Sequence, residues 1–351
     1  MKQSAKPDFA VVAGHLRAMF RSRLLVAAVH HLKVFEQFDD GALAMADLRR
    51  RLGLKERPAM VLFPALRAMS LLKLDSTGKL FITALGRCLT IASTPNLVSY
   101  LGLEKDDPGV IEMASRLKND GPLNAGQGIA YVKEGTEPSP MDDAKAARYL
   151  TLALAGRAGI LSPIAAEQMP RLEGHLLDVA GGSGLFAYEW LRLNPKSSAT
   201  VFDRPRVLAV AAEFLEEFCR SGKRGADSVK KRVKLQPGNM LEDTLPRADM
   251  VLAASLFHDW PEETCVALAR RFAGALNPGG SVWAHDAFLD DTMDGPLAVA
   301  DYSAQLFWVT KGRCYSRREY RDWFARAGLL PVKKEIPTAM DYSLISARKP
   351  R

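Results

Sequence analysis

A histidine stands just after an apolar run and is followed by acidic residues. The run Met250–Ala254 predicts a buried strand, and the segment FHDWPEE occupies residues 257–263. An unperturbed imidazole has a pKa of about 6.5, so at pH 7 His258 is expected to be largely neutral and able to accept a proton. The same placement also suits a histidine that caps the next helix or packs in the core. Asp286 ends a later apolar run, where a carboxylate can fix the tautomer of a catalytic histidine.

A glycine-rich turn precedes this pair in the chain. The segment LLDVAGGSG, which begins at Leu176, predicts a strand, a tight turn and the start of a helix. Glycines let a ligand approach the backbone closely, and the amides at a helix start offer donors to an anionic or polar group. Asp203 follows about twenty residues later, where an acid binds the hydroxyls of a ribose. Because Gly182, Gly184 and Ala187 also satisfy the dinucleotide fingerprint, nicotinamide binding remains an alternative.

Strands alternate with helices in the part of the chain that must position these residues. The predicted strands are Leu176–Ala180, Ala199–Phe202, Val233–Gln236, Met250–Ala254 and Ser281–Phe288. Such alternation predicts a parallel, doubly wound sheet, which binds ligands beyond the carboxyl ends of its strands. The runs Leu329–Glu335 and Tyr342–Ala347 have no helix between them and predict a closing antiparallel hairpin.

The first quarter of the chain carries the whole excess of positive charge. Residues 1–95 hold 15 Lys and Arg against 7 Asp and Glu, while the remainder holds 33 of each. Helices predicted over 8–36, 45–53 and 57–72, followed by two short strands around a turn at 75–78, suggest a winged helix. A DNA-binding regulator is therefore a rival hypothesis, and its phosphate contacts would be Arg49, Arg50, Arg51, Lys55 and Arg57.

Length and composition exclude several other classes of protein. The 351 residues are 48% hydrophobic and 25% charged, which allows full-sized cores and excludes disordered or fibrous chains. The runs Leu24–Val29 and Met250–Phe257 fall short of the roughly twenty residues that span a bilayer, so no membrane partner is expected. Four widely spaced cysteines predict neither a zinc site nor a disulfide framework, and we expect no metal. The N-terminus has no apolar export signal, so a cytoplasmic location is the default expectation.

Five segments occur in the order and at the spacings of one enzyme family. They are LLDVAGGSG from Leu176, FDRPRV from Phe202, GNM from Gly238, FHDWPEE from Phe257 and LNPGG from Leu276. The chain resembles class I S-adenosylmethionine-dependent O-methyltransferases, in particular the winged-helix, dimeric group that includes caffeate, acetylserotonin, polyketide and phenazine enzymes. The resemblance extends over nearly the whole chain. It implies a Rossmann-like catalytic domain, S-adenosylmethionine as cofactor, S-adenosylhomocysteine as product, and a homodimer formed through the winged helix rather than a nucleic-acid partner.

The resemblance also implies roles for individual positions and segments. It places the winged-helix dimerisation domain at residues 1–95, a helical connector at 96–165 and the catalytic domain at 166–351. His258 would be the general base, Asp286 its orienting acid, and Cys314 would stand where many members have a second acid. The cofactor-binding positions would be Asp178, Gly181, Gly182, Gly184, Asp203, Arg204, Asn239, Met240 and Ser255. The substrate would contact Gln305, Phe307 and Trp308.

Several positions depart from the family pattern. Ala180 replaces the first glycine of the turn, which is compatible with the turn if its φ is negative. Asn239 replaces an acid but keeps an oxygen acceptor for the adenine amine. Ala254 stands where plant members have a lysine, and Asp286 is shorter than the usual Glu. Cys314 leaves Asp286 as the one acid that the pattern provides to orient His258.

The sequence therefore favours O-methylation of a small aromatic or polyketide-type hydroxyl. Cys314 keeps a second possibility open, in which a cofactor-binding relative has drifted to decarboxylation, hydroxylation or a pericyclic reaction. The DNA-binding regulator and a nicotinamide-dependent enzyme remain weaker alternatives.

Overall fold

The structure is a computed structural model that describes residues 8–39, 41–121 and 139–351. The chain divides into two compact units. Unit 1 comprises Met1–Ile129 and Leu289–Ser316, and unit 2 comprises Ala130–Phe288 and Arg317–Arg351. This grouping differs from the boundaries at residues 95 and 165 expected from the sequence. Residues 289–316 group with unit 1 because α11 (Leu297–Val309) packs with the N-terminal helices.

Unit 1 is built on four helices that pack against one another. They are α1 (Phe9–Val26), α3 (Glu56–Ala68), α6 (Pro108–Asn119) and α11. The short helix α2 (Met45–Arg51) and the antiparallel strands β1 (Leu72–Leu74) and β2 (Leu80–Ile82) lie where the sequence predicts a winged helix. The turn between the strands forms because the Asp75 carboxylate accepts hydrogen bonds from the amides of Thr77 and Lys79. The remaining short elements are η1 (Ala27–His31), η2 (Phe35–Phe38), α4 (Ala84–Arg87), α5 (Val98–Leu101) and η3 (Gly102–Glu104).

A mostly parallel sheet forms the centre of unit 2. Its strands run in the order β5-β4-β3-β6-β7-β10-β8, and β9 pairs with β10. The first five strands of this order are parallel, and β10 is antiparallel to β7, β8 and β9. The predicted doubly wound sheet with a closing antiparallel segment is thus confirmed. The strands are β3 (His175–Val179), β4 (Ser198–Asp203), β5 (Val233–Pro237), β6 (Ala248–Ala254), β7 (Leu276–Ala287), β8 (Leu330–Pro331), β9 (Ile336–Pro337) and β10 (Tyr342–Arg348).

The predicted and observed strands differ most in length at β7 and β8. The strand β7 begins at Leu276 rather than at Ser281, and a register shift lets residues 277–280 bulge out between the pairs Ala248–Leu276 and Met250–Ser281. The first half of the expected hairpin is reduced to Leu330–Pro331, although the Val332 amide still donates to the Ser346 carbonyl of β10.

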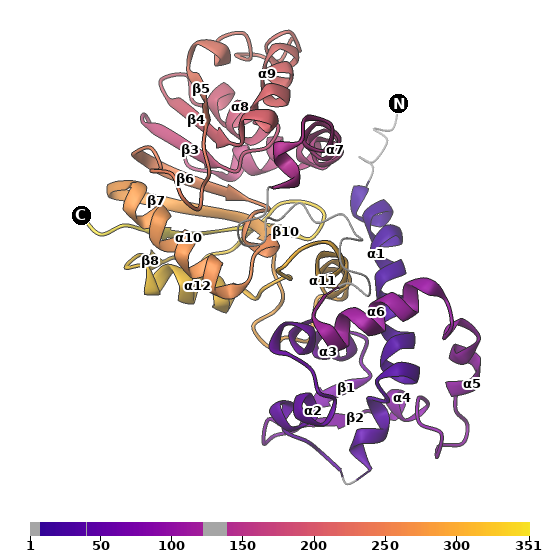
Figure 1. Ribbon diagram of the computed structural model, residues 1–351. Coiled ribbons are helices and arrows are strands. Elements are labelled where there is room, and N and C mark those ends of the chain that lie inside the picture. Colours follow the sequence, from indigo (N-terminus) through magenta and orange to yellow (C-terminus); the bar gives the residue numbers. More distant parts are fainter. Residues whose placement is uncertain (1–7, 40, 122–138) are drawn as a thin grey trace, which may run out of the picture. The chain divides into compact units, whose positions relative to one another are not determined.

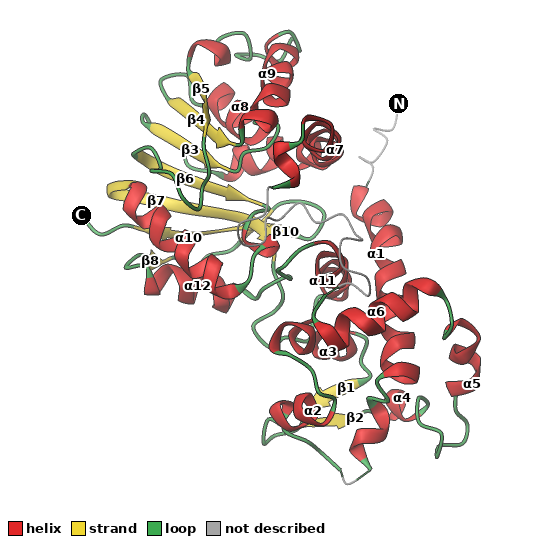
Figure 2. Ribbon diagram, in the orientation of Figure 1, coloured by secondary structure: helices red, strands yellow, loops and turns green. Residues whose placement is uncertain are grey.

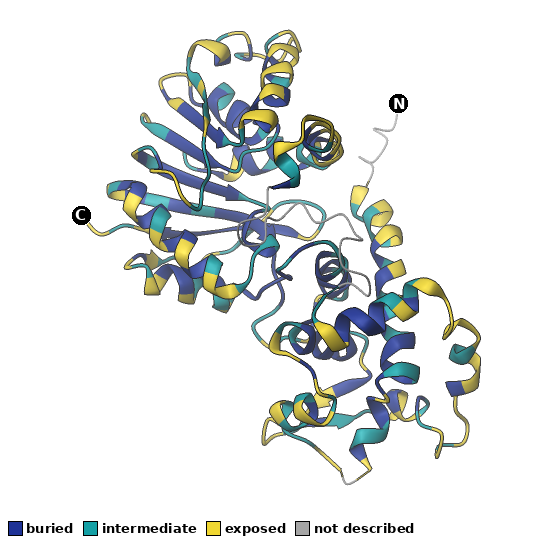
Figure 3. Cartoon of the chain, viewed as in Figure 1, coloured by how far each residue is buried: buried dark blue, intermediate teal, exposed yellow. Residues whose placement is uncertain are grey.

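Helices cover both faces of the sheet. Figures 1 and 2 show α7 (Ala144–Gln168), α8 (Leu185–Leu193) and α9 (Pro205–Cys219) on one face, and α10 (Glu262–Ala275) and α12 (Arg317–Arg326) on the other. The strands between them are largely buried (Figure 3). The remaining elements of unit 2 are η4 (Pro140–Asp142), η5 (Val229–Lys231) and η6 (Phe257–Asp259).

The helix α7 is long and apolar enough to cross a membrane by length and composition alone, which was not expected from the sequence. A helix in the core of a globular unit passes the same test. Within unit 2, α7 packs against α8 and α9, and its alanine-rich side is buried there. Of its most apolar 18-residue stretch 39% is buried, and Tyr149, Leu152 and Leu154 are exposed.

The direction of strand order reverses between β3 and β6. From β3 the chain first adds β4 and β5 on one side, and then returns to add β6 and β7 on the other. Loops that leave the two central strands diverge at such a reversal and leave a crevice beyond the carboxyl ends. Both segments with predicted chemistry, the glycine-rich turn and FHDWPEE, leave the sheet at this point.

Candidate active site

The glycine-rich turn connects β3 to α8 through left-handed backbone conformations. Gly182 and Gly184 have φ values of +57° and +76°, which glycine adopts without strain. Ala180 has a φ of +52°, so the expectation of a negative φ there was wrong. The reversal from strand to helix is tight enough to require the left-handed conformation at Ala180, at a cost of about 1 kcal/mol for a residue with a Cβ.

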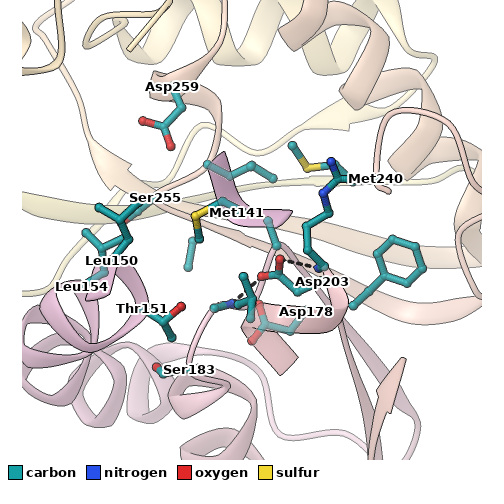
Figure 4. Close-up of a pocket in the computed structure, with 18 of the residues that line it drawn as sticks. Met141, Leu150, Thr151, Leu154, Asp178, Ser183, Asp203, Met240, Ser255 and Asp259 are labelled. Carbon is teal, nitrogen blue, oxygen red and sulfur yellow. Dashed lines mark hydrogen bonds between the residues drawn. The ribbon is translucent and has the colours of Figure 1, made fainter. Parts of the chain in front are cut away.

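A pocket lies beyond the carboxyl ends of β3, β4, β5 and β6, with α7 as one wall. Figure 4 shows Leu150, Thr151 and Leu154 projecting from α7 beside Asp178 and Asp203. Eight of the predicted cofactor positions line this pocket: Asp178, Gly181, Gly182, Asp203, Arg204, Asn239, Met240 and Ser255. Gly184 does not line it and instead occupies the N-cap position of α8.

The carboxylate of Asp203 is held by two backbone amides. Its Oδ2 accepts from Gly182 at 2.8 Å and its Oδ1 accepts from Arg204 at 2.7 Å. Burial raises the pKa of Asp203 to about 6, although these hydrogen bonds oppose the rise. The bonds fix the carboxylate at the end of β4, and its remaining lone pairs can accept from a ribose diol.

Asp178 is a buried carboxylate whose two oxygens have no hydrogen-bond partner among the described residues. Burial, and secondly the nearby Asp203, raises its pKa to about 8. A buried carboxylate without a partner is costly, and a cation would compensate it. S-adenosylmethionine carries an ammonium and a sulfonium together with a ribose diol, so the donors and acceptors at this end of the pocket fit that cofactor.

His258 and Asp286 meet as the sequence predicted. His258 lies in η6 after β6, Asp286 lies near the end of β7, and the distance from Nδ1 to Oδ1 is 2.5 Å. Both residues are buried. Burial alone would lower the pKa of His258, but the carboxylates of Asp286 and Asp259 and the hydrogen bond to Asp286 raise it overall. The pKa of His258 therefore lies above the unperturbed value assumed from the sequence.

His258 is set behind the wall of the pocket. Its side chain is only 3% exposed and does not line the cavity, whereas Leu256, Asp259 and Trp260 do. The Nε2 atom lies 3.6 Å from Oδ1 of Asp259. Burial raises the pKa of Asp259 to about 6, partly opposed by His258.

Three residues near His258 were not identified from the sequence. Asp259 is adjacent to His258 in the motif, and that adjacency was the signal that could have found it. Arg157 of α7 lines the pocket and lies over the Tyr342 ring, 5.3 Å from its centroid. Its positive charge lowers the pKa of His258. Tyr320 of α12 donates its hydroxyl hydrogen to Oδ2 of Asp286 at 2.6 Å, and no sequence pattern links these positions.

Four of the predicted site residues belong to unit 1. Cys314 is buried there, and its amide donates to the Ser303 hydroxyl at 3.1 Å. Phe307 is buried beneath the guanidinium of Arg57, 4.6 Å from the ring centroid. The half-buried residues Gln305 and Trp308 lie on the same helix, α11. The assignment of these four side chains to the reaction site stays a prediction.

The positive side chains that suggested DNA binding have partners within unit 1. Arg49 and Arg50 pair with Glu56 and Asp47, and Arg51 donates to the carbonyl of Gln37. Lys55 and Arg57 donate to Asn119 and Asp120. Arg57 is the most strongly engaged of the five, because it also donates to the carbonyls of Thr310 and Gly312.

Comparison with known proteins agrees with this arrangement of fold and site. The O-methyltransferase domain family matches residues 150–330. The crystal structure of an O-methyltransferase family 2 protein from Planctomyces limnophilus, in complex with apigenin, is 34% identical, has a TM-score of 0.87 and covers 99% of this chain and 98% of that one.

Two enzymes with assigned activities are also similar. The 3-hydroxy-5-methyl-1-naphthoate 3-O-methyltransferase of Streptomyces sahachiroi is 28% identical over 90% of this chain and 88% of that protein. The acetylserotonin O-methyltransferase of Mus musculus is 33% identical over 49% of this chain and 43% of that protein. The family match spans more than half of the chain and contains both the glycine-rich turn and the His258–Asp286 pair. The chain therefore belongs to the O-methyltransferase domain family and is an S-adenosylmethionine-dependent O-methyltransferase.

Proposed function

We propose that this enzyme methylates a hydroxyl of a small aromatic or polyketide-type molecule, with His258 as the general base. The observation that carries the proposal is the buried hydrogen bond between His258 and Asp286, at the edge of the sheet that also holds the pocket. A similar protein acts on a hydroxynaphthoate, and another was crystallised with apigenin, which supports an aromatic acceptor.

The cofactor would occupy the pocket between the glycine-rich turn and the ends of β4 and β5. Asp178 would face its positive charge, Asp203 would accept from its ribose hydroxyls, and Asn239 and Met240 would contact its adenine. S-adenosylmethionine supplies a methyl group that is already activated on a sulfonium. The protein therefore needs chiefly to align an oxygen nucleophile and to remove its proton.

The base would act through Nε2. Asp286 binds Nδ1, which fixes the tautomer and leaves Nε2 as the nitrogen that takes the proton. The nearby negative charge of Asp286 then stabilises the imidazolium that forms. For a phenol with a pKa of about 10, a positioned base contributes about 10² to 10⁴ in rate. Because His258 lies behind the pocket wall, we propose that the acceptor hydroxyl approaches it past Asp259 and Trp260.

We also propose that the enzyme is a homodimer in which a second copy covers part of α1. The side chains of Val12 and Leu16 are 70% and 55% exposed, and Phe9, Val11 and Met19 on the same helix are also exposed. A run of large apolar side chains on one helix is typical of a protein interface.

The first experiment is calorimetric titration with S-adenosylmethionine, S-adenosylhomocysteine and NAD, together with mass spectrometry of a phenolic and polyketide panel for the gain of one methylene. Binding of both adenosyl ligands with a methylated product supports the proposal. Binding without any product across a broad panel favours drifted chemistry, for which Cys314 is the sequence feature, and Cys314→Glu becomes the next variant. Binding of NAD alone would overturn the cofactor assignment.

A further inference from the structure

We propose that Tyr320 is a positioning residue of the methyl-transfer site, which holds Asp286 in the orientation that supports His258. The proposal rests on the proposed role of His258 as base. Tyr320 does not line the pocket, so it would act through Asp286 and not on the acceptor itself.

The carboxylate of Asp286 is fixed at both of its oxygens. Its Oδ1 receives the hydrogen bond from Nδ1 of His258 at 2.5 Å and accepts from the Ala287 amide at 2.8 Å. Its Oδ2 accepts from the Tyr320 hydroxyl at 2.6 Å. Without Tyr320, hydrogen bonds to Oδ1 alone would limit rotation of the Asp286 carboxylate about its Cβ–Cγ bond. The Tyr320 hydroxyl therefore fixes the orientation of the carboxylate plane relative to the imidazole ring.

The hydrogen-bond donor to Oδ2 of Asp286 is an uncharged group. A phenol has an ordinary pKa of about 10, so Tyr320 donates a hydrogen bond without adding charge beside the base. The negative charge of Asp286 is thus kept, and that charge stabilises the imidazolium. A second carboxylate, as the family pattern has near position 314, would act differently because it would add negative charge.

The ring of Tyr320 is held rigidly by aromatic neighbours. Its centroid lies 5.2 Å from that of Phe257, 4.9 Å from that of Phe288 and 4.9 Å from that of Trp323. Phe257 is adjacent to His258 in the chain and is itself fully buried. A side chain packed on this many sides has little freedom, so its hydroxyl is aimed at Asp286 before substrate binds.

Other charged groups near His258 must be separated from the effect of Tyr320. Asp286 approaches from β7, Asp259 from η6 and Arg157 from α7. These three groups remain in a Tyr320→Phe variant. The substitution removes one hydroxyl and keeps the ring, so a change in the acid limb of the pH profile reports the hydrogen bond to Asp286.

The test compares the pH dependence of kcat/KM in the parent enzyme and in Tyr320→Phe. In this variant Oδ2 of Asp286 stays buried but loses its hydrogen bond from Tyr320. The carboxylate becomes more basic and stabilises the protonated form of His258 more strongly. We expect kcat at neutral pH to fall about tenfold, the acid limb to move to higher pH, and the affinity for S-adenosylmethionine to stay unchanged.

The matched control is Tyr188→Phe. It also removes one buried tyrosine hydroxyl, which donates to the Ala211 carbonyl at 3.0 Å and does not touch Asp286. We expect its acid limb to stay at the parental pH. An unchanged kcat and acid limb in folded Tyr320→Phe would overturn the proposal, as would an equal shift in both variants.

A fluorinated tyrosine at position 320 keeps the test decisive if the phenylalanine variant does not fold. Fluorination makes the hydroxyl a stronger donor, so the acid limb should move to lower pH, and an unmoved limb would contradict the proposal. Failure of His258 as base has a separate signature. In that case His258→Ala would retain turnover, whatever the result at Tyr320.

Discussion

At the scale of single residues, the properties of the proposed base, His258, depend on the groups that surround it. His258 is buried against Asp286, and their hydrogen bond joins two elements that are 28 residues apart in the chain. Burial disfavours the imidazolium, while two carboxylates favour it by more. This balance is compatible with the proposed role of His258, because the carboxylates would stabilise the imidazolium that forms when a buried histidine takes a proton.

Replacement of this histidine should separate chemistry from binding. We expect His258→Ala to lower kcat by about 10² to 10⁴, because the positioned base is lost. The calorimetric affinity for S-adenosylmethionine should stay close to the parental value, since the side chain does not line the pocket. Equal losses of turnover and cofactor affinity would show that His258 has a structural role instead.

The pH profile should respond to Arg157. A base must be deprotonated to act, so kcat/KM rises with pH through the pKa of His258, which we expect above 6.5 in the free enzyme. The positive charge of Arg157 lowers this pKa. The variant Arg157→Met should therefore move the acid limb to still higher pH. The surface variant Arg148→Met, on the same helix and paired with Glu213, serves as the control and should leave the limb in place.

At the scale of elements, the turn from β3 to α8 forms one wall of the pocket at the carboxyl edge of the sheet. Its amide from Gly182 holds the Asp203 carboxylate at the end of the neighbouring strand. The turn and the strand end therefore form one unit, and distortion of either should disturb the cofactor.

Two glycines of this turn give a matched pair of variants. At Gly184, φ is +76° and a Cβ would come within 2.3 Å of the Tyr188 ring and hydroxyl. At Gly182, φ is +57° but no heavy atom lies within 4 Å of the added Cβ. We expect Gly184→Ala to lose about 2 to 4 kcal/mol of unfolding free energy, and Gly182→Ala about 1 kcal/mol. Denaturant unfolding measures both, and equal losses would mean that backbone strain alone controls the turn.

At the scale of the whole molecule, the exposed apolar face of α1 predicts self-association. We expect the double variant Val12→Glu and Leu16→Glu to convert a dimer to a monomer in light scattering after size exclusion. Both side chains are exposed within one chain, so the substitutions should not disturb its own core. The control is Lys145→Glu on the exposed start of α7, which adds negative charge elsewhere. A parent enzyme that is monomeric at micromolar concentration would contradict the homodimer.

Much of the architecture could be predicted because it depends on local patterns. Apolar runs of strand length, separated by amphipathic helices, placed β3 to β7 to within five residues at each end. The glycine-rich turn and the FHDWPEE segment were recognised because each is continuous in sequence. Their place at the carboxyl ends of neighbouring strands follows from parallel winding alone.

Tertiary structure decided the features that depend on neighbours from distant segments. The sequence alone suggested a negative φ at Ala180, but the tight reversal onto α8 requires a positive one. It also suggested a nearly unperturbed His258, whose pKa is in fact set by burial and by carboxylates on two elements. Tyr320 of α12 donates a hydrogen bond to Asp286, which lies 34 residues earlier in the chain, and no sequence motif links the two positions. The sequence determined the fold and the presence of His258 and Asp286 at the carboxyl edge of its sheet, because these follow from periodicity and local motifs. Tertiary packing decided the orientation of His258 and Asp286 and the shifts in their pKa values. Both depend on desolvation and on hydrogen bonds from every side chain that contacts the pair.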